Sequence, residues 1–181
     1  MDIFLTRLIY QLPHTTISNA IAHFLSFQSI WILLWFPIIG LIFIKIYQKN
    51  LMILLMLSSG MLTTYLFVEY FFKPFFDRPR PFSYFGIFPP QTAPYNYPND
   101  FSFPSLHTAL AFNAAYILSF FFPRCSIVFY AAAVCVAFSR IYLGYHYALD
   151  IIGGAIIGIL FALTIKKLML YETQRKTAQI A

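Results

Sequence analysis

The chain alternates between long apolar stretches and short polar connections. The apolar stretches, which hold very few charges, are 28–47, 51–72, 105–122, 124–142 and 148–170. Such lengths suit the apolar helix of about 20 residues that crosses a hydrocarbon core about 30 Å thick. The pattern therefore predicts an all-α fold, a polytopic transmembrane helical bundle of about five spans.

Three segments depart from this pattern. Segment 1–24 mixes charged residues with an apolar face of helical period, which predicts an N-terminal interfacial helix. Between 74 and 104, proline, tyrosine and asparagine predict one long outer loop. Residues 171–181 are polar and form the expected cytoplasmic tail. We expect a single integral membrane domain over 1–181.

Composition agrees with a membrane protein and argues against a soluble one. Hydrophobic residues make up 60% of the 181 positions and charged residues only 10%. A soluble domain of this size cannot bury so much apolar surface. The formal net charge of +6 does not indicate a nucleic-acid partner, because in a membrane protein the placement of basic residues carries the information.

Basic residues near the span ends predict the orientation. If the five spans alternate in direction, seven basic residues near span ends lie on one side of the membrane. They are Lys45, Lys49, Arg124, Lys166, Lys167, Arg175 and Lys176. Lysine and arginine favour the cytoplasmic side, so the amino end and 73–104 should lie outside. The chain should therefore be a multi-pass membrane protein whose polar residues at 73–104 face the outside.

Three short blocks concentrate polar and charged residues at predicted helix ends. They are Lys73-Pro-Phe-Phe-Asp-Arg-Pro-Arg-Pro81, Phe103-Pro-Ser-Leu-His107 and Ser139-Arg-Ile-Tyr-Leu-Gly-Tyr-His-Tyr-Ala-Leu-Asp150. The end of the second span, the start of the third, the end of the fourth and the start of the fifth share one membrane face. The topology therefore brings the three blocks to the same depth.

This face should bind an anion. Lys73, Arg80 and Arg140 would repel one another there unless an anion neutralised them, and phosphate suits guanidinium groups best. Ser105 at a helix start adds free backbone N–H groups and the positive end of a helix dipole. The residues thus predict a phosphate site.

Two histidines and a carboxylate complete the predicted chemistry. His146 and Asp150 are four residues apart, so one helix face presents both. A carboxylate that accepts one ring N–H leaves the other nitrogen free to attack phosphorus. His107 can donate a proton to the leaving oxygen and later take one from water.

These blocks resemble the signature of the type 2 phosphatidic acid phosphatase superfamily over residues 73–150. The resemblance implies a metal-independent phosphatase that needs no cofactor and forms a phosphohistidine. It implies that His146, His107 and Asp150 are catalytic. The phosphate-binding residues that it implies are Lys73, Arg80, Ser105 and Arg140.

Other positions in the blocks have open roles. Arg78 either contacts phosphate or faces water, and Pro81 completes the first block. Leu106 stands where the family commonly has glycine or aspartate. Outside the implied set, we expect Glu69 to pair with Lys73, four residues later. Asp100 and Ser102 should serve the loop or cap the third span.

The expected substrate is a membrane lipid phosphate or diphosphate. The small size and minimal loops of the chain resemble bacterial undecaprenyl diphosphate phosphatases. This resemblance implies undecaprenyl diphosphate as the favoured substrate and the bacterial inner membrane as the location, with the site facing the outside or periplasm. Phosphatidylglycerophosphate or phosphatidic acid is the alternative, and a lipid phosphotransferase is the other enzyme class that a phosphohistidine permits. A transporter is disfavoured because the charges lie at span ends rather than within the spans. Head-group preference and oligomeric state stay open.

Overall fold

A computed structural model of the chain describes residues 1–26, 45, 52–83 and 100–180. Its elements are α1 (Asp2–Tyr10), α2 (Thr16–Leu25), α4 (Met52–Phe67), the π-helix η1 (Val68–Phe72), α5 (Lys73–Phe76), the 3₁₀ turn η2 (Pro81–Ser83), α6 (Leu106–Phe121), the 3₁₀ turn η3 (Pro123–Cys125), α7 (Ser126–Tyr142) and α8 (Ala148–Ile180). Within these described ranges the secondary structure is helical and includes no strand, so the predicted all-α class is confirmed.

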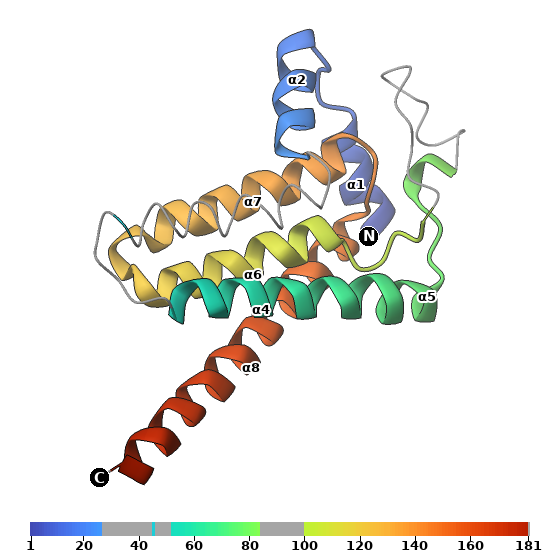
Figure 1. Cartoon of the computed structure of the whole chain (residues 1–181). Helices are drawn as coiled ribbons and strands as arrows, with labels where there is room; N and C mark the ends of the chain where they lie inside the picture. Colours follow the sequence, from blue (N-terminus) through green and yellow to red (C-terminus); the bar gives the residue numbers. More distant parts are fainter. Residues whose placement is uncertain (27–44, 46–51, 84–99, 181) are drawn as a thin grey trace.

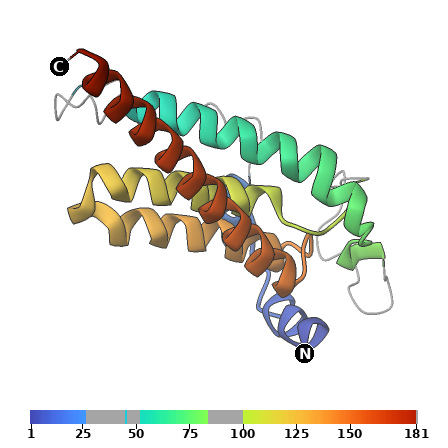
Figure 2. The same cartoon turned by 90° about the horizontal axis from the view of Figure 1, so that it is seen from below.

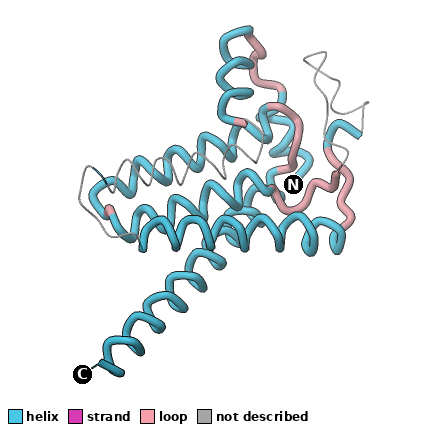
Figure 3. The backbone as a smooth tube through the Cα atoms, in the orientation of Figure 1, coloured by secondary structure: helices cyan, strands magenta, loops and turns pink. Residues whose placement is uncertain are grey.

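The long helices form a bundle with one oblique member. Helices α4, α6 and α7 lie side by side, and α8 crosses them and extends beyond the bundle (Figures 1 and 2). Helix α6 packs against α8, α7 and α4, and is therefore the central helix. The connecting loops at the amino-terminal side of α6 and α8 gather at one end (Figure 3).

Three helical segments are long and apolar enough to cross a membrane: Met52–Ser83, Pro123–Tyr142 and Ala148–Arg175. Helix α6 is apolar but shorter, with 16 residues. Four of the predicted spans thus coincide with observed helices. The fifth, predicted over 28–47, lies outside the described residues.

Two predicted boundaries were wrong. Helix continues through η1 and α5 to Phe76, so the outer loop begins at Asp77 and not at 74. Asp77 adopts a left-handed conformation (φ 45°), which ends this helix. The segment predicted as a tail from 171 continues α8 as far as Ile180.

Small residues set the contact between α6 and α8. A Cβ on Gly158 would lie 2.1 Å from the Ala109 carbonyl oxygen, and one on Gly154 would lie 2.6 Å from that of Ser105. Larger side chains would push the helices apart, as is typical of close helix pairs in membranes. This contact holds the start of α8 against the start of α6.

A buried amide links three helices inside the bundle. The Asn113 side chain on α6 donates to Thr64 Oγ1 on α4 at 3.1 Å and to the Gly158 carbonyl on α8 at 3.2 Å. Side chains of this kind hold membrane helices together because the surrounding apolar atoms offer no other partner.

The amino-terminal segment contains two helices rather than the single interfacial helix that we predicted. Helix α1 exposes an apolar face made of Ile3, Phe4 and Leu8, as the helical period indicates, and Leu12 is exposed just beyond its end. Helix α2 begins with a capping box in which Thr15 and Ser18 exchange hydrogen bonds. The opposite face of α1 contacts the start of α8.

Candidate active site

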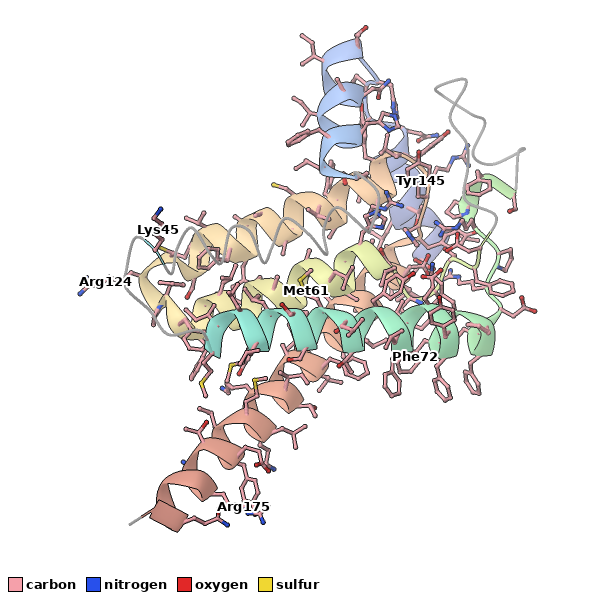
Figure 4. All side chains as sticks on the ribbon, viewed as in Figure 1. Lys45, Met61, Phe72, Arg124, Tyr145 and Arg175 are labelled. Carbon is pink, nitrogen blue, oxygen red and sulfur yellow. The ribbon has the colours of Figure 1, made fainter. Side chains whose placement is uncertain are left out.

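The predicted blocks meet at the loop end of the bundle. Figure 4 places Tyr145 at this end, whereas Lys45 and Arg124 lie at the other end. The ends of α5 and α7 and the starts of α6 and α8 therefore share one face, as the topology predicted. Ser105 N–H donates to the Asp150 carbonyl at 3.0 Å, which fixes the second block against the third.

A tight turn carries His146 back to Arg140. The Arg140 carbonyl accepts hydrogen bonds from Tyr145 N–H at 3.0 Å and His146 N–H at 3.3 Å. Gly144 makes this turn with a φ of 72°, a backbone conformation that residues with a side chain rarely adopt. A Cβ at this position would also lie 2.8 Å from the Tyr10 ring. Helix α1 thus covers the turn that positions His146.

His146 is almost fully buried, with 1% of its surface exposed. Its Nδ1 lies 2.8 Å from the Ser102 carbonyl, and because a carbonyl only accepts, Nδ1 carries the proton. Nε2 then holds the lone pair and lies 3.3 Å from Arg80 Nη1. Burial, together with the charges of Arg80, Arg140 and Lys73, holds the pKa of His146 well below its usual range, so the ring is neutral.

Asp150 orients its neighbours rather than making the predicted hydrogen bond to the imidazole. Its Oδ2 lies 3.5 Å from His146 Nδ1, an electrostatic contact longer than a hydrogen bond to this ring. The same oxygen accepts from Ser102 Oγ and from Tyr147 N–H at 2.8 Å. Asp150 therefore holds the Ser102 segment, whose carbonyl in turn sets the tautomer of His146.

Lys73 and Arg80 are both buried and share a carboxylate. Asp100 contacts Lys73 Nζ through Oδ2 and Arg80 Nη2 through Oδ1 at 2.6 Å. Lys73 also pairs with Glu69 at 2.8 Å, which confirms the predicted i, i+4 pair. Burial raises the pKa of Asp100, but Arg80 and Lys73 outweigh burial and bring it below its ordinary value. Of the two roles expected for Asp100 and Ser102, serving the loop or capping the third span, the capping role is wrong, because the N-cap of α6 is Ser105 and no side chain caps it.

Arg140 is the third buried cation. Its guanidinium stacks 4.5 Å from the Tyr145 ring centroid, and Nη1 donates to the Ser26 carbonyl at 3.4 Å. Its Nε is buried and has no hydrogen-bond partner among the described residues. A buried guanidinium with unused donor capacity suits an anion.

The second block opens α6. Ser105 and His107 are buried, and Ser105 Oγ accepts from Thr108 Oγ1 at 3.0 Å instead of capping the helix. Leu106 is buried in an apolar cluster with Met61 and Val68, which explains an apolar residue at this position. Pro81 is buried and begins η2 directly after Arg80.

Arg78 belongs to a different set of contacts from Arg80. It pairs with Asp150 Oδ1 at 2.6 Å and with Asp2 Oδ2, and its guanidinium lies 4.1 Å from the Tyr147 ring centroid. Both options that we left open for Arg78, phosphate or water, overlooked these two carboxylates. Asp2 comes from α1, and no pattern in the sequence places α1 beside the three blocks.

Helix α1 also caps α8. Asp2 Oδ1 accepts from Leu149 N–H at 2.9 Å, and Thr6 Oγ1 accepts from Ala148 N–H at 3.0 Å. A helix start leaves such donors without partners inside its own helix, and buried ones need partners from elsewhere. Helix α1 thus supports Asp150 from outside the sequence blocks.

Among the residues that the structure describes, no group of three His, Cys, Asp or Glu side chains could hold a metal ion. The site brings together the buried cations Lys73, Arg80 and Arg140, the carboxylates Glu69 and Asp100, and the neutral imidazole of His146. This arrangement can bind a phosphoryl group and offer Nε2 of His146 to its phosphorus atom. The metal-independent reaction stays a prediction.

Comparison with known proteins finds one family. A model of the PAP2 superfamily matches residues 49–174, which include all three blocks. The bacitracin transport permease protein BcrC of Bacillus licheniformis is 41% identical over 64 residues, which are 35% of this chain and 32% of that protein. The chain spans about a third or less of the length of the curated relatives that it matches.

Two crystal structures share the fold. LpxE of Aquifex aeolicus is 27% identical with a TM-score of 0.69, and the similarity covers 92% of this chain and 94% of that one. A PAP2 type phosphatidylglycerolphosphate phosphatase of Bacillus subtilis is 24% identical with a TM-score of 0.64, covering 94% and 85%. The second, at this low identity, supports the fold alone.

Proposed function

Because this chain belongs to the PAP2 superfamily, we propose that it is a membrane phosphatase that hydrolyses a lipid phosphate or diphosphate without a metal ion. The observation that carries this proposal is the buried, neutral His146, whose Nε2 faces Arg80 within a cluster of buried cations. A neutral imidazole is a nucleophile, and buried cations stabilise the charge of a phosphoryl group in transfer.

In the first step, Nε2 of His146 attacks phosphorus. The Nε2–P bond forms while the bond between phosphorus and the leaving oxygen breaks, and protonated His107 supplies the proton that the leaving oxygen takes up. The hydrogen bond that Nδ1–H donates to the Ser102 carbonyl stabilises the positive charge that develops on the ring. Lys73, Arg80, Arg140 and the N–H groups at the start of α6 hold the phosphoryl oxygens.

In the second step, water attacks the phosphohistidine. His107 takes the proton from water, the Nε2–P bond breaks, and inorganic phosphate leaves with neutral His146 restored. Asp150 keeps the Ser102 carbonyl in place through both steps. In this scheme it is a positioning residue, since its carboxylate reaches the imidazole mainly through Ser102.

A lipid substrate is supported by the surface beside the site. Phe71, Phe75 and Phe76 expose their rings close to Lys73 in the sequence, and Phe76 packs edge to face on Phe103 at 4.6 Å. Figure 4 shows aromatic rings projecting from this end of the bundle, near Phe72. A lipid chain can lie against this apolar surface while its head group reaches the buried cations.

Undecaprenyl diphosphate is the substrate that we favour, and the proposed setting is the bacterial inner membrane with the site facing the periplasm. Phosphatidylglycerophosphate and phosphatidic acid are the alternatives. Transfer of the phosphoryl group to a lipid hydroxyl is the other outcome that a phosphohistidine allows.

A substrate panel tests this function. Purified protein is given undecaprenyl diphosphate, phosphatidylglycerophosphate and phosphatidic acid, with and without an acceptor lipid and a chelator, and released phosphate is measured. We expect release with chelator present, and a loss of roughly a thousandfold or more in His146→Ala. Activity that chelator abolishes and magnesium restores would contradict the metal-independent scheme. Phosphate that appears on the acceptor lipid instead of in solution would identify a transferase.

A further inference from the structure

The Asp100 carboxylate takes up the donors that a phosphate would need. Its side chain contacts Lys73 Nζ and Arg80 Nη2, and its backbone carbonyl accepts from Arg80 Nε at 2.9 Å. The Nε and Nη2 edge of a guanidinium is one of the edges that bind carboxylate or phosphate with two parallel hydrogen bonds. Asp100 occupies this edge of Arg80.

The remaining nitrogen of Arg80 faces the candidate nucleophile. Nη1 donates to the Tyr145 carbonyl at 2.9 Å and lies 3.3 Å from His146 Nε2. A phosphoryl group within reach of Nε2 must approach this same guanidinium. Substrate phosphate and the Asp100 carboxylate therefore compete for the N–H groups of Arg80.

Burial decides which partner can move. The side chains of Lys73 and Arg80 are 6% and 4% exposed, whereas that of Asp100 is 34% exposed. A charge that is already partly hydrated loses little by turning into water, while the buried cations need a replacement anion. The carboxylate is the group that can give way.

We propose that Asp100 is a specificity-determining residue of the phosphate site, an internal anion that an incoming phosphate must displace from Lys73 and Arg80. This inference rests on the proposed function of the same site. Small anions such as inorganic phosphate have only their charge with which to displace the carboxylate. A lipid phosphate adds the binding of its chain to the apolar surface, so Asp100 selects for lipid substrates and against the product.

The matched variants are Asp100→Asn and Asp77→Asn. Both remove one negative charge at the same end of the bundle, but Asp77 is exposed and forms no described ion pair with either cation. Asparagine also tolerates the left-handed conformation of residue 77. Asp100→Glu keeps the charge and serves as a second control.

Binding of inorganic phosphate is measured directly, by phosphorus NMR titration, and as product inhibition of lipid hydrolysis. We expect Asp100→Asn to bind phosphate roughly tenfold more tightly, the order of one charged contact, with Asp77→Asn and Asp100→Glu close to wild type. The preference for long-chain over short-chain lipid phosphates, as a ratio of kcat/KM, should fall in Asp100→Asn.

Phosphate affinity in Asp100→Asn that equals or falls below that of wild type, in protein with an unchanged melting temperature, would overturn the proposal. If Asp100→Asn does not fold, Asp100→Ser is titrated in the same way, with the same two outcomes. Direct binding does not require turnover. A protein that binds phosphate in this pattern and hydrolyses none of the lipids would refute the proposed function, but it would still show that Asp100 and phosphate compete for Lys73 and Arg80.

Discussion

Two neighbouring groups of charges at the site end differ in their balance. In the carboxylate network, Asp2 and Asp150 surround the single cation Arg78, and Ser102, Tyr147 and Leu149 donate further hydrogen bonds to the carboxylates. In the cation cluster, Lys73 pairs with Glu69 and Asp100, and Arg80 pairs with Asp100. Arg140 forms no ion pair with the residues that the structure describes. The first group is paired within the protein and the second carries excess positive charge.

Because of this difference, we expect the carboxylate network to stabilise the fold and the cation cluster to bind the substrate phosphate. Removing a member of the carboxylate network leaves buried partners unpaired and should lower stability. Removing Arg140, which forms no ion pair with the described residues, relieves repulsion between like charges, so it should lower activity without lowering stability. The melting temperature should therefore fall when a charge is removed from the carboxylate network and should not fall when Arg140 is removed.

The largest expected effect is at Asp150. Asp150→Asn keeps the shape of the side chain but removes the charge that Arg78 and Ser102 contact. We expect kcat/KM to fall roughly 10³-fold or more and stability to fall by about 3–5 kcal/mol. Phosphate release and thermal unfolding in detergent measure both quantities. Glu172→Gln, at an exposed position of α8, is the control. An Asp150→Asn protein as stable as wild type would show that the network does not support the fold.

At Arg140 we expect a large loss of activity without a loss of stability. Arg140→Gln removes one of three like charges, and kcat/KM should fall roughly 100-fold because a phosphoryl contact is lost. The melting temperature should stay constant or rise. Arg124→Gln, exposed at the other end of the bundle, controls for loss of a surface charge. A clear drop in melting temperature only for Arg140→Gln would remove the distinction between the two groups.

A smaller effect is expected at Asp2. Asp2→Ala removes one of the two carboxylates around Arg78 and a cap of α8, so stability should fall by about 1–2 kcal/mol. Activity should fall by no more than roughly tenfold, since Asp150 still holds Arg78. Arg7→Gln on the exposed face of α1 is the control. Unchanged unfolding in Asp2→Ala would mean that α1 does not support the network.

The smallest effect concerns pH. Burial and the nearby cations lower the pKa of His146, so the acid limb of kcat/KM should lie below the ordinary histidine value of 6.5. Arg140→Gln removes one of the cations that lower the pKa of His146, so this pKa should rise and the acid limb should move to higher pH. A shift to lower pH would contradict the assignment. Arg124→Gln should leave the profile in place.

Much of the fold followed from the sequence. Apolar length predicted the helices, and loop length predicted that the blocks at 73–81, 103–107 and 139–150 share one face. These features depend on local pattern and on alternation of helix direction. The end of α8 was missed because a polar sequence such as 171–180 still favours helix when it continues a span.

The site was predicted less completely. Helix alternation predicted that the cations and histidines of the three blocks lie close together. The partners of Arg78 and His146 depend on tertiary contacts that spacing along the chain does not encode. The sequence did contain a sign that Asp100 and Ser102 belong to the site, because both are polar and lie within three residues of the second block, 103–107. Their proximity to that block could have marked them as part of the site rather than as loop or cap residues. Asp2 had no such signal.

In the proposed reaction, His146 carries the phosphoryl group and His107 moves the proton. Rapid-quench mass spectrometry on a substrate whose leaving group needs no proton tests it most directly. Wild type and His107→Ala should both form acid-labile phosphohistidine at residue 146, because the step no longer needs an acid. His146→Ala should form none. Phosphate on residue 107, or trapped in His146→Ala, would contradict the account.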